Sequence, residues 1–256
     1  MKRLLVIPLF MLATLIAVAQ DVTFQVGKIS FKMIHIVGGT FKMGATSEQV
    51  SEAEPNEFPV HRVTLSDFYL GETEVTQELW EAVMGKNPSF FVGNSKRPVE
   101  NVSWIDCQTF LRRLNDLLHK NGQLNNNQTF TLPTEAQWEY AARGGNKSKH
   151  LKYAGSNSIG SVAWFYYSKG VTHSVGLKMA NELGLYDMSG NVFEWCADWY
   201  TPWELADNEM VADTARVLRG GSWSSPSKKC RISNRFCQQP DTRAGNFGLR
   251  LALVEE

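Results

Sequence analysis

Two carboxylates seven residues apart, Asp187 and Glu194, are the clearest candidates for metal chemistry in this chain. They flank the segment Met-Ser-Gly-Asn-Val-Phe. Carboxylates are hard oxygen ligands, and a glycine between them allows backbone carbonyls to turn inward. This combination suits Ca²⁺, which takes about 6–8 oxygen ligands. The alternative is a turn in which Glu194 accepts hydrogen bonds from loop amides.

A second candidate is the segment Gly220-Gly-Ser-Trp223 together with the cysteine that follows it, Cys230. The other cysteines are Cys107, Cys196 and Cys237. Four thiols allow several disulfide pairings in an oxidising compartment. We favour Cys196 with Cys230, because each follows one of the two prominent motifs, and leave the other pairings open. There is no Cys-x-x-C and no Cys/His spacing typical of zinc.

The charge balance argues against a nucleic-acid partner. The chain has 26 basic and 26 acidic residues, a formal net charge of zero, and no block of Lys or Arg. Proteins that bind a phosphate backbone usually carry a basic stripe or patch. The 256 residues are 43% hydrophobic, which is enough to form a sizeable core.

The amino terminus has the features of a secretory signal peptide. Lys2 and Arg3 precede an apolar run, residues 4–18, which ends in Ala-Val-Ala before Gln20. This order predicts a signal peptide over residues 1–19. The apolar run is shorter than the about 20 residues of a membrane span, so we expect no transmembrane segment after cleavage. We expect an exported protein, in the periplasm, at the cell surface or secreted; an uncleaved anchor is the alternative.

The elements that would position these residues begin with short strands. Residues 20–30 are predicted as a leader before the domain. Segments rich in β-forming residues follow at 31–37, 38–44 and 60–69. The polar, acidic stretch 45–59 is predicted as a loop.

Three helices are predicted from their end signals. The first covers residues 77–84 and ends at Gly85. The other two begin with capping pairs, in which Ser103 or Thr134 is followed three residues later by Asp or Gln. After the third helix the pattern indicates short strands and long loops rich in Gly, Asn and Ser. We expect a single α+β domain over residues 31–256.

Three motifs occur in order along the chain: Leu132-Pro-Thr-Glu-Ala-Gln-Trp-Glu-Tyr-Ala-Ala-Arg-Gly-Gly145, Asn181-Glu-Leu-Gly-Leu-Tyr-Asp-Met-Ser-Gly-Asn-Val-Phe-Glu-Trp195 and Arg219-Gly-Gly-Ser-Trp223. Together they resemble the formylglycine-generating enzyme (sulfatase-modifying factor) family. The resemblance runs from about Gly38 to Ala252. It implies an elaborated C-type-lectin-like fold of the α+β class with much irregular loop. Enzymes of this family oxidise a cysteine of newly made sulfatases to formylglycine, using two thiols that hold copper.

The resemblance also implies a structural calcium site. Its ligands here would be the side chains of Asp187 and Glu194 and the backbone carbonyls of Gly190 and Val192. Such an ion would crosslink a loop that has little hydrophobic area.

The thiol positions of the family enzymes fall on Ser225 and Cys230. A serine hydroxyl is a hard, protonated ligand and does not replace a thiolate on copper(I). We therefore expect no copper and no catalytic residues. If the protein is active, Cys230 and Ser222 would carry the chemistry.

The sequence is compatible with three functions. The favoured one is a non-catalytic exported family member that binds a protein, peptide or glycan, or serves envelope assembly. The second is a formylglycine-generating thiol oxidase with a variant active site. The third is a diversified lectin-like protein whose ligand surface would include residues 224–229.

Overall fold

The first sheet lies at the centre of the amino-terminal half of the protein. The computed structural model describes residues 20–168, 170–202 and 214–255, and the predicted signal peptide, residues 1–19, lies outside them. The sheet is antiparallel, with the strand order β1-β2-β5-β11-β6. Its strands are β1 (Val22–Val26), β2 (Ile29–Ile36), β5 (Phe68–Gly71), β11 (Ala252–Glu255) and β6 (Gln128–Thr131).

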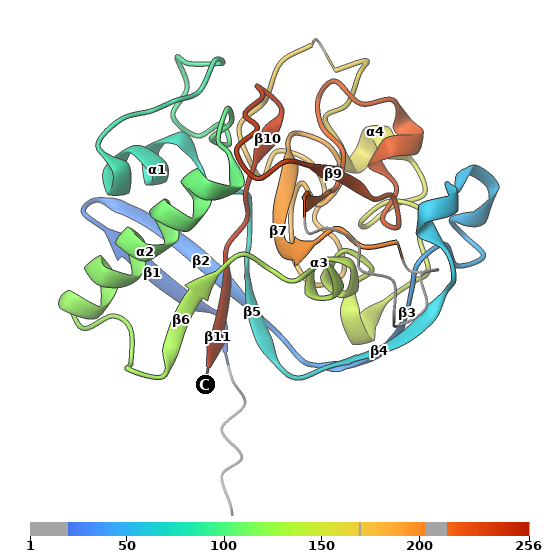
Figure 1. Ribbon diagram of the computed structural model, residues 1–256, viewed down its shortest axis with the longest axis horizontal. Helices are drawn as coiled ribbons and strands as arrows, with labels where there is room; N and C mark the ends of the chain where they lie inside the picture. The colour runs from blue at the N-terminus through green and yellow to red at the C-terminus, as the bar shows by residue number, and fades with distance from the viewer. Residues whose placement is uncertain (1–19, 169, 203–213, 256) are drawn as a thin grey trace, which may run out of the picture.

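Two helices, α1 (Gln77–Met84) and α2 (Trp104–Lys120), pack beside this sheet (Figure 1). The Thr76 hydroxyl accepts the Leu79 N–H in the first turn of α1, and Ser103 forms a reciprocal capping box at the start of α2. Buried side chains of both helices join the sheet in one hydrophobic cluster. Both predicted helices are confirmed, because their end signals act within one helical turn.

The second sheet carries the candidate site. Its strand order is β10-β7-β8-β9, with β10 parallel to β7. The third predicted helix is confirmed as α3, begins after the Thr134 cap and packs against β7 and β8. The elements are α3 (Glu135–Ala142), α4 (Ile159–Val162), β7 (Phe193–Trp199), β8 (Arg216–Arg219), β9 (Phe236–Gln238) and β10 (Phe247–Gly248).

A two-stranded ribbon, β3 (Gly39–Met43) with β4 (His61–Leu65), lies apart from both sheets. The prediction of one strand over 60–69 was wrong, because the chain changes sheet after Leu65: β4 pairs with β3, and β5 pairs with β2 and β11. The Asp67 carboxylate fixes this change of direction by accepting the Gly38 N–H at 2.9 Å.

The segment 20–30 is not a separate leader. It forms β1 and the beginning of β2, and Phe24 and Val26 are buried in the core. The α+β class and the irregular character of the carboxyl-terminal half are confirmed. Within the described ranges no helix is long and apolar enough to cross a membrane.

Candidate functional site

The Asp187–Glu194 loop leads directly into β7 and is tightly wound. Asp187 and Asn191 adopt φ values of 57° and 60°, and Gly190 has a φ of 84°. A side chain at Gly190 would overlap the backbone of Trp164, so glycine is required there for close approach as well as for its φ. The loop is therefore held in one shape by the segment that packs against it.

Glu194 is fully engaged by protein groups. Arg250 donates from Nη2 to Glu194 Oε1 at 2.7 Å, and Trp138 Nε1 donates to Oε2 at 2.7 Å. Arg250 also donates to the carbonyls of Gly71 and Tyr186 at 2.8 and 2.7 Å. All of this lies in the protein interior. These hydrogen bonds, several of them assisted by the Arg250 charge, hold the Glu194 carboxylate in place.

Asp187 is only half satisfied. Its Oδ2 accepts the Gly176 N–H at 2.7 Å, whereas its buried Oδ1 has no hydrogen-bond partner in the described ranges. Burial raises the pKa of Asp187 to about 6, against the opposing effects of the Gly176 amide and the Arg250 charge. An oxygen of this kind is suited to a cation or a proton.

Glu74 completes the cluster. Its carboxylate accepts the Asn191 side-chain amide at 2.6 Å and the Val192 N–H at 3.0 Å. Burial, followed by the charges of Asp187 and Glu194, raises its pKa well above the usual value. The family motifs contain no hint of Glu74, because it lies in the segment after β5 and meets the loop only in the folded chain.

The four predicted calcium ligands fit the structure only in part. Asp187 Oδ1 is available to a cation, but both Glu194 oxygens face the guanidinium of Arg250. The described residues contain no group of three His, Cys, Asp or Glu side chains placed to hold a metal. Asp187 is thus the one of the two predicted side-chain ligands that has a free oxygen among the described residues. Calcium at this loop stays a prediction.

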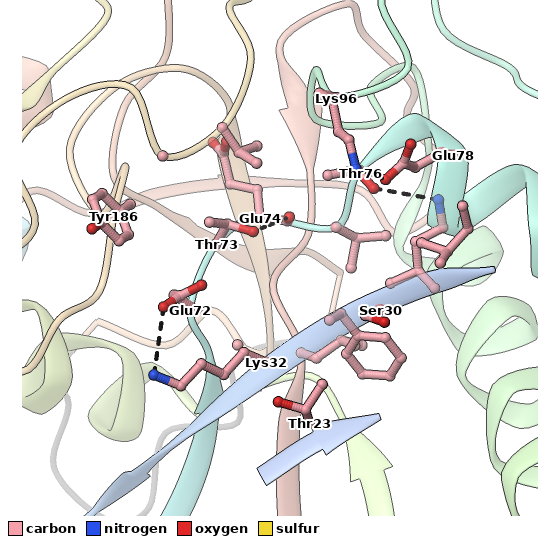
Figure 2. Close-up of a pocket in the computed structure, with 18 residues that line it drawn as sticks. Thr23, Ser30, Lys32, Glu72, Thr73, Glu74, Thr76, Glu78, Lys96 and Tyr186 are labelled. Atoms are coloured by element: carbon pink, nitrogen blue, oxygen red, sulfur yellow. Dashed lines mark hydrogen bonds and ion pairs between the residues drawn. The ribbon is translucent and has the colours of Figure 1, made fainter. Parts of the chain in front are cut away.

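A cavity of about 440 Å³ reaches the Glu74 segment from the surface. Figure 2 shows it between β1 and β2 on one side and the chain from Glu72 to Glu78 on the other. At one end of the cavity, Lys32 Nζ lies 3.7 Å from Glu72 Oε1. At the other end, Lys96 forms an ion pair with Glu78 (Figure 2). Glu74 is the member of the buried acid cluster that lines this cavity.

The thiol of the second candidate segment is buried. Cys230 Sγ packs against the backbone of Gly221, the Cys230 side chain is 0% exposed, and burial raises its thiol pKa to about 12. Ser225 Oγ accepts the Ser222 N–H at 3.0 Å and lies 3.0 Å from Ser222 Oγ. Copper(I) prefers thiolate ligands, whereas burial favours the protonated form of the Cys230 thiol and Ser222 offers only a hydroxyl.

The favoured disulfide is not formed. Cys196 and Cys230 are both free and buried, as is Cys107, and Cys237 is free and partly exposed. The two motifs that we used to pair the cysteines lie in the same half of the protein, but their thiols belong to separate hydrophobic clusters.

Exposed aromatic side chains border the Trp223–Ser225 turn. Tyr166 and Tyr167 are 62% and 81% exposed, and Tyr166 N–H bonds the Ser225 carbonyl at 3.0 Å. Phe90 is also exposed and packs beside Gly245, whose carbonyl accepts the Trp223 Nε1–H at 2.9 Å. We call the surface formed by Phe90, Tyr166, Tyr167, Trp223 and Ser224 the loop face. Composition alone does not reveal it, since the number of aromatic residues does not show which of their side chains are exposed.

The family follows from these features together with sequence comparison. The profile described as "Sulfatase-modifying factor enzyme 1-like domain" matches residues 24–254. The chain therefore belongs to this family, and its fold is the C-type-lectin-like fold of formylglycine-generating enzymes.

Among individual proteins, the chain is similar to Chaperone protein LppX of Paenibacillus barcinonensis, with 37% identity over 80% of this chain and 83% of that protein. It is 27% identical to the formylglycine-generating enzyme of Streptomyces coelicolor, over 86% of this chain and 88% of the enzyme. Among solved structures, Treponema denticola variable protein 1 aligns with a TM-score of 0.78 and 33% identity, covering 92% of this chain and 99% of that one.

Proposed function

We propose that this protein is a non-catalytic member of its family that binds another polypeptide through the loop face. The observation that carries the proposal is the state of Cys230, which is fully buried with a thiol pKa raised to about 12. The neighbouring position that would need a second thiol is Ser225, whose hydroxyl is engaged by Ser222. A copper ion at this place would therefore lack the pair of thiolate ligands that the family enzymes use.

A polypeptide partner is supported by the chemistry of the loop face. Exposed tyrosine and phenylalanine side chains offer large apolar contact area with few rotatable bonds, and they are common at protein-binding surfaces. Leu177 and Met179 are further exposed apolar side chains on the loop before Asn181. The name of the 37% identical relative, a chaperone, is in keeping with a partner that is itself a protein.

The catalytic alternative is tested by incubating the protein with copper(I), a reductant and a peptide containing Cys-x-Pro-x-Arg, followed by mass spectrometry. We expect the peptide to remain unchanged. Ser225→Cys is the matched variant: it would restore activity only if the rest of an oxidase site were intact. Conversion of the peptide to the aldehyde by the unaltered protein would overturn the proposal.

The binding surface is tested with reduced, carboxymethylated α-lactalbumin as a permanently unfolded polypeptide. We expect Tyr166→Ser/Tyr167→Ser to weaken its binding by about tenfold or more, since two aromatic contacts are lost. Ile105→Ser is the control, because Ile105 is a similarly exposed apolar residue on α2. Equal loss in the two variants would refute the loop face. Preferential binding of neutral glycans on an array would favour the lectin-like alternative.

We further propose that the protein is exported and that its mature chain begins at Gln20. The support is the sequence order of basic residues, apolar run and Ala-Val-Ala. Intact mass of the protein recovered from its natural host would decide this, and a chain that retains residues 1–19 would contradict it.

A further inference from the structure

A pair of unneutralised cations lies on the β3–β4 ribbon. Lys42 and Arg62 are direct cross-strand partners, and both are exposed. Thr40 and Thr64, two residues along on the same face, bring their hydroxyls to 2.8 Å from each other. Like charges placed directly opposite each other on a sheet are destabilising. Neither cation forms an ion pair with an acid in the part of the chain that the structure describes.

The two cations border a groove of about 820 Å³. Its opposite wall is the turn after α3, which includes Asn146, Ser148 and His150. The same turn carries Lys147 and Lys149, both exposed. The volume is in the range of ordinary ligand pockets, about 300–1,000 Å³. Lys42 and Arg62 are thus lining residues of the groove, and Lys147 and Lys149 alternate in sequence with three of its other lining residues.

The acid of the groove does not neutralise these cations. Glu48 accepts from Arg143 Nη1 at 2.8 Å and from the Thr46 hydroxyl, so its charge is already compensated. Arg143 is in turn held by Glu139 at 2.7 Å. Lys42 and Arg62 thus retain their full charge toward the groove, in a chain whose formal net charge is zero.

We propose that this groove binds an anionic glycan, a saccharide that carries sulfate or carboxylate groups. Two adjacent cations can share one such group, which also relieves their mutual repulsion. The remaining lining is rich in hydroxyl and amide side chains, from Thr40, Ser47, Asn146 and Ser148, which match the hydroxyls of a sugar. Phe41, Val60 and Tyr140 supply aromatic and apolar parts of the lining, on which the face of a sugar ring can pack. The site is distinct from the loop face, because it is built on the β3–β4 ribbon and the turn after α3.

The test uses dextran sulfate and polygalacturonate as the sulfate and carboxylate probes, with unsubstituted dextran as the neutral control. Binding is measured by calorimetry on the full mature chain at low salt. We expect at least one of the two anionic probes to bind and unsubstituted dextran not to bind. The affinity for the anionic probe should fall as the salt concentration rises. The stronger probe identifies the anionic group that the groove prefers.

The decisive variant is Lys42→Gln/Arg62→Gln, which we expect to weaken binding of the preferred probe by about tenfold or more. Arg112→Gln/Lys120→Gln is the matched control, since it removes the same charge from exposed positions on α2. The melting temperature of the first variant should not fall, because a repulsive pair is removed. If it does fall, Lys42→Gln alone replaces it.

The proposal would be overturned by no binding of either anionic probe, by equal weakening in the test and control variants, or by tighter binding of poly-L-glutamate or duplex DNA than of both glycans. The Tyr166→Ser/Tyr167→Ser variant separates this site from the proposed function. It should bind the anionic probe as the unaltered protein does. Loss of binding in that variant would place the anion elsewhere and likewise overturn the proposal.

Discussion

Glu100 provides a sharp test of the electrostatics beneath the loop face. Its side chain is 0% exposed; Oε1 accepts the Phe91 N–H at 2.8 Å, and the buried Oε2 has no partner among the described residues. Burial raises the Glu100 pKa from 4.5 to about 7, against the opposing effect of the Phe91 and Phe90 amides. The carboxylate that holds the Phe90–Phe91 turn is thus one that prefers to keep its proton.

The sign of the pH effect follows from this direction. Between pH 4.5 and about 7 the folded protein retains a proton that the unfolded chain has released, so Glu100 lowers the free energy of unfolding as pH rises through this window. Below pH 4.5 the ionisation of Glu100 does not change the free energy of unfolding, and above about pH 7 the loss of stability is complete. A shift of this size corresponds to roughly 3 kcal/mol at full effect, of which about 2.5 kcal/mol develops between pH 5 and pH 8.

The perturbation is Glu100→Gln, which keeps an acceptor for the Phe91 amide but cannot ionise. Urea unfolding at pH 5 and pH 8 gives the free energy of unfolding of both proteins. We expect the variant to gain about 2.5 kcal/mol relative to the unaltered protein on going from pH 5 to pH 8. The desolvated amide of glutamine adds a constant cost of about 1 kcal/mol that cancels in this difference.

Glu81→Gln is the control, since Glu81 is an exposed glutamate on α1. It should change the free energy of unfolding equally at both pH values. The free energy of unfolding of Glu100→Gln is compared with that of the unaltered protein at each pH. If the difference between the two proteins is the same at pH 5 and pH 8, within about 0.5 kcal/mol, the reasoning from burial is refuted.

Two further predictions concern the buried acid cluster. Arg250→Met should lower the free energy of unfolding by about 3–5 kcal/mol in urea, because Glu194 loses its buried cation while Asp187 and Glu74 remain beside it. Glu194→Gln/Arg250→Met should recover part of this loss, and an additive double variant would contradict the coupling. If calcium occupies the loop, a chelator should lower the melting temperature, and Asp187→Ala should remove most of that sensitivity. A melting curve indifferent to both calcium and chelator would support the turn interpretation instead.

The features that the sequence determined by itself are those set by contacts within a few residues. Ser103 and Thr134 mark the beginnings of two of the three main helices, because a cap bonds to an amide only two or three positions ahead, and Gly85 marks the end of the first. The motifs around Asp187 and Trp223 were sufficient to identify the family and hence the fold. The sequence also shows that Ser225 stands at one of the two positions where the family resemblance places a thiol.

The tertiary structure decided which distant residues meet. Glu74 and Arg250 lie far from the Asp187–Glu194 loop in sequence, and only the folded chain shows that Arg250, rather than an ion alone, faces Glu194. Lys42 and Arg62 became neighbours only when the strand predicted over 60–69 divided between two sheets. Local propensity carries no information on such pairings, because they depend on which strands associate. They also depend on how burial in the folded protein changes the energy of a charged group.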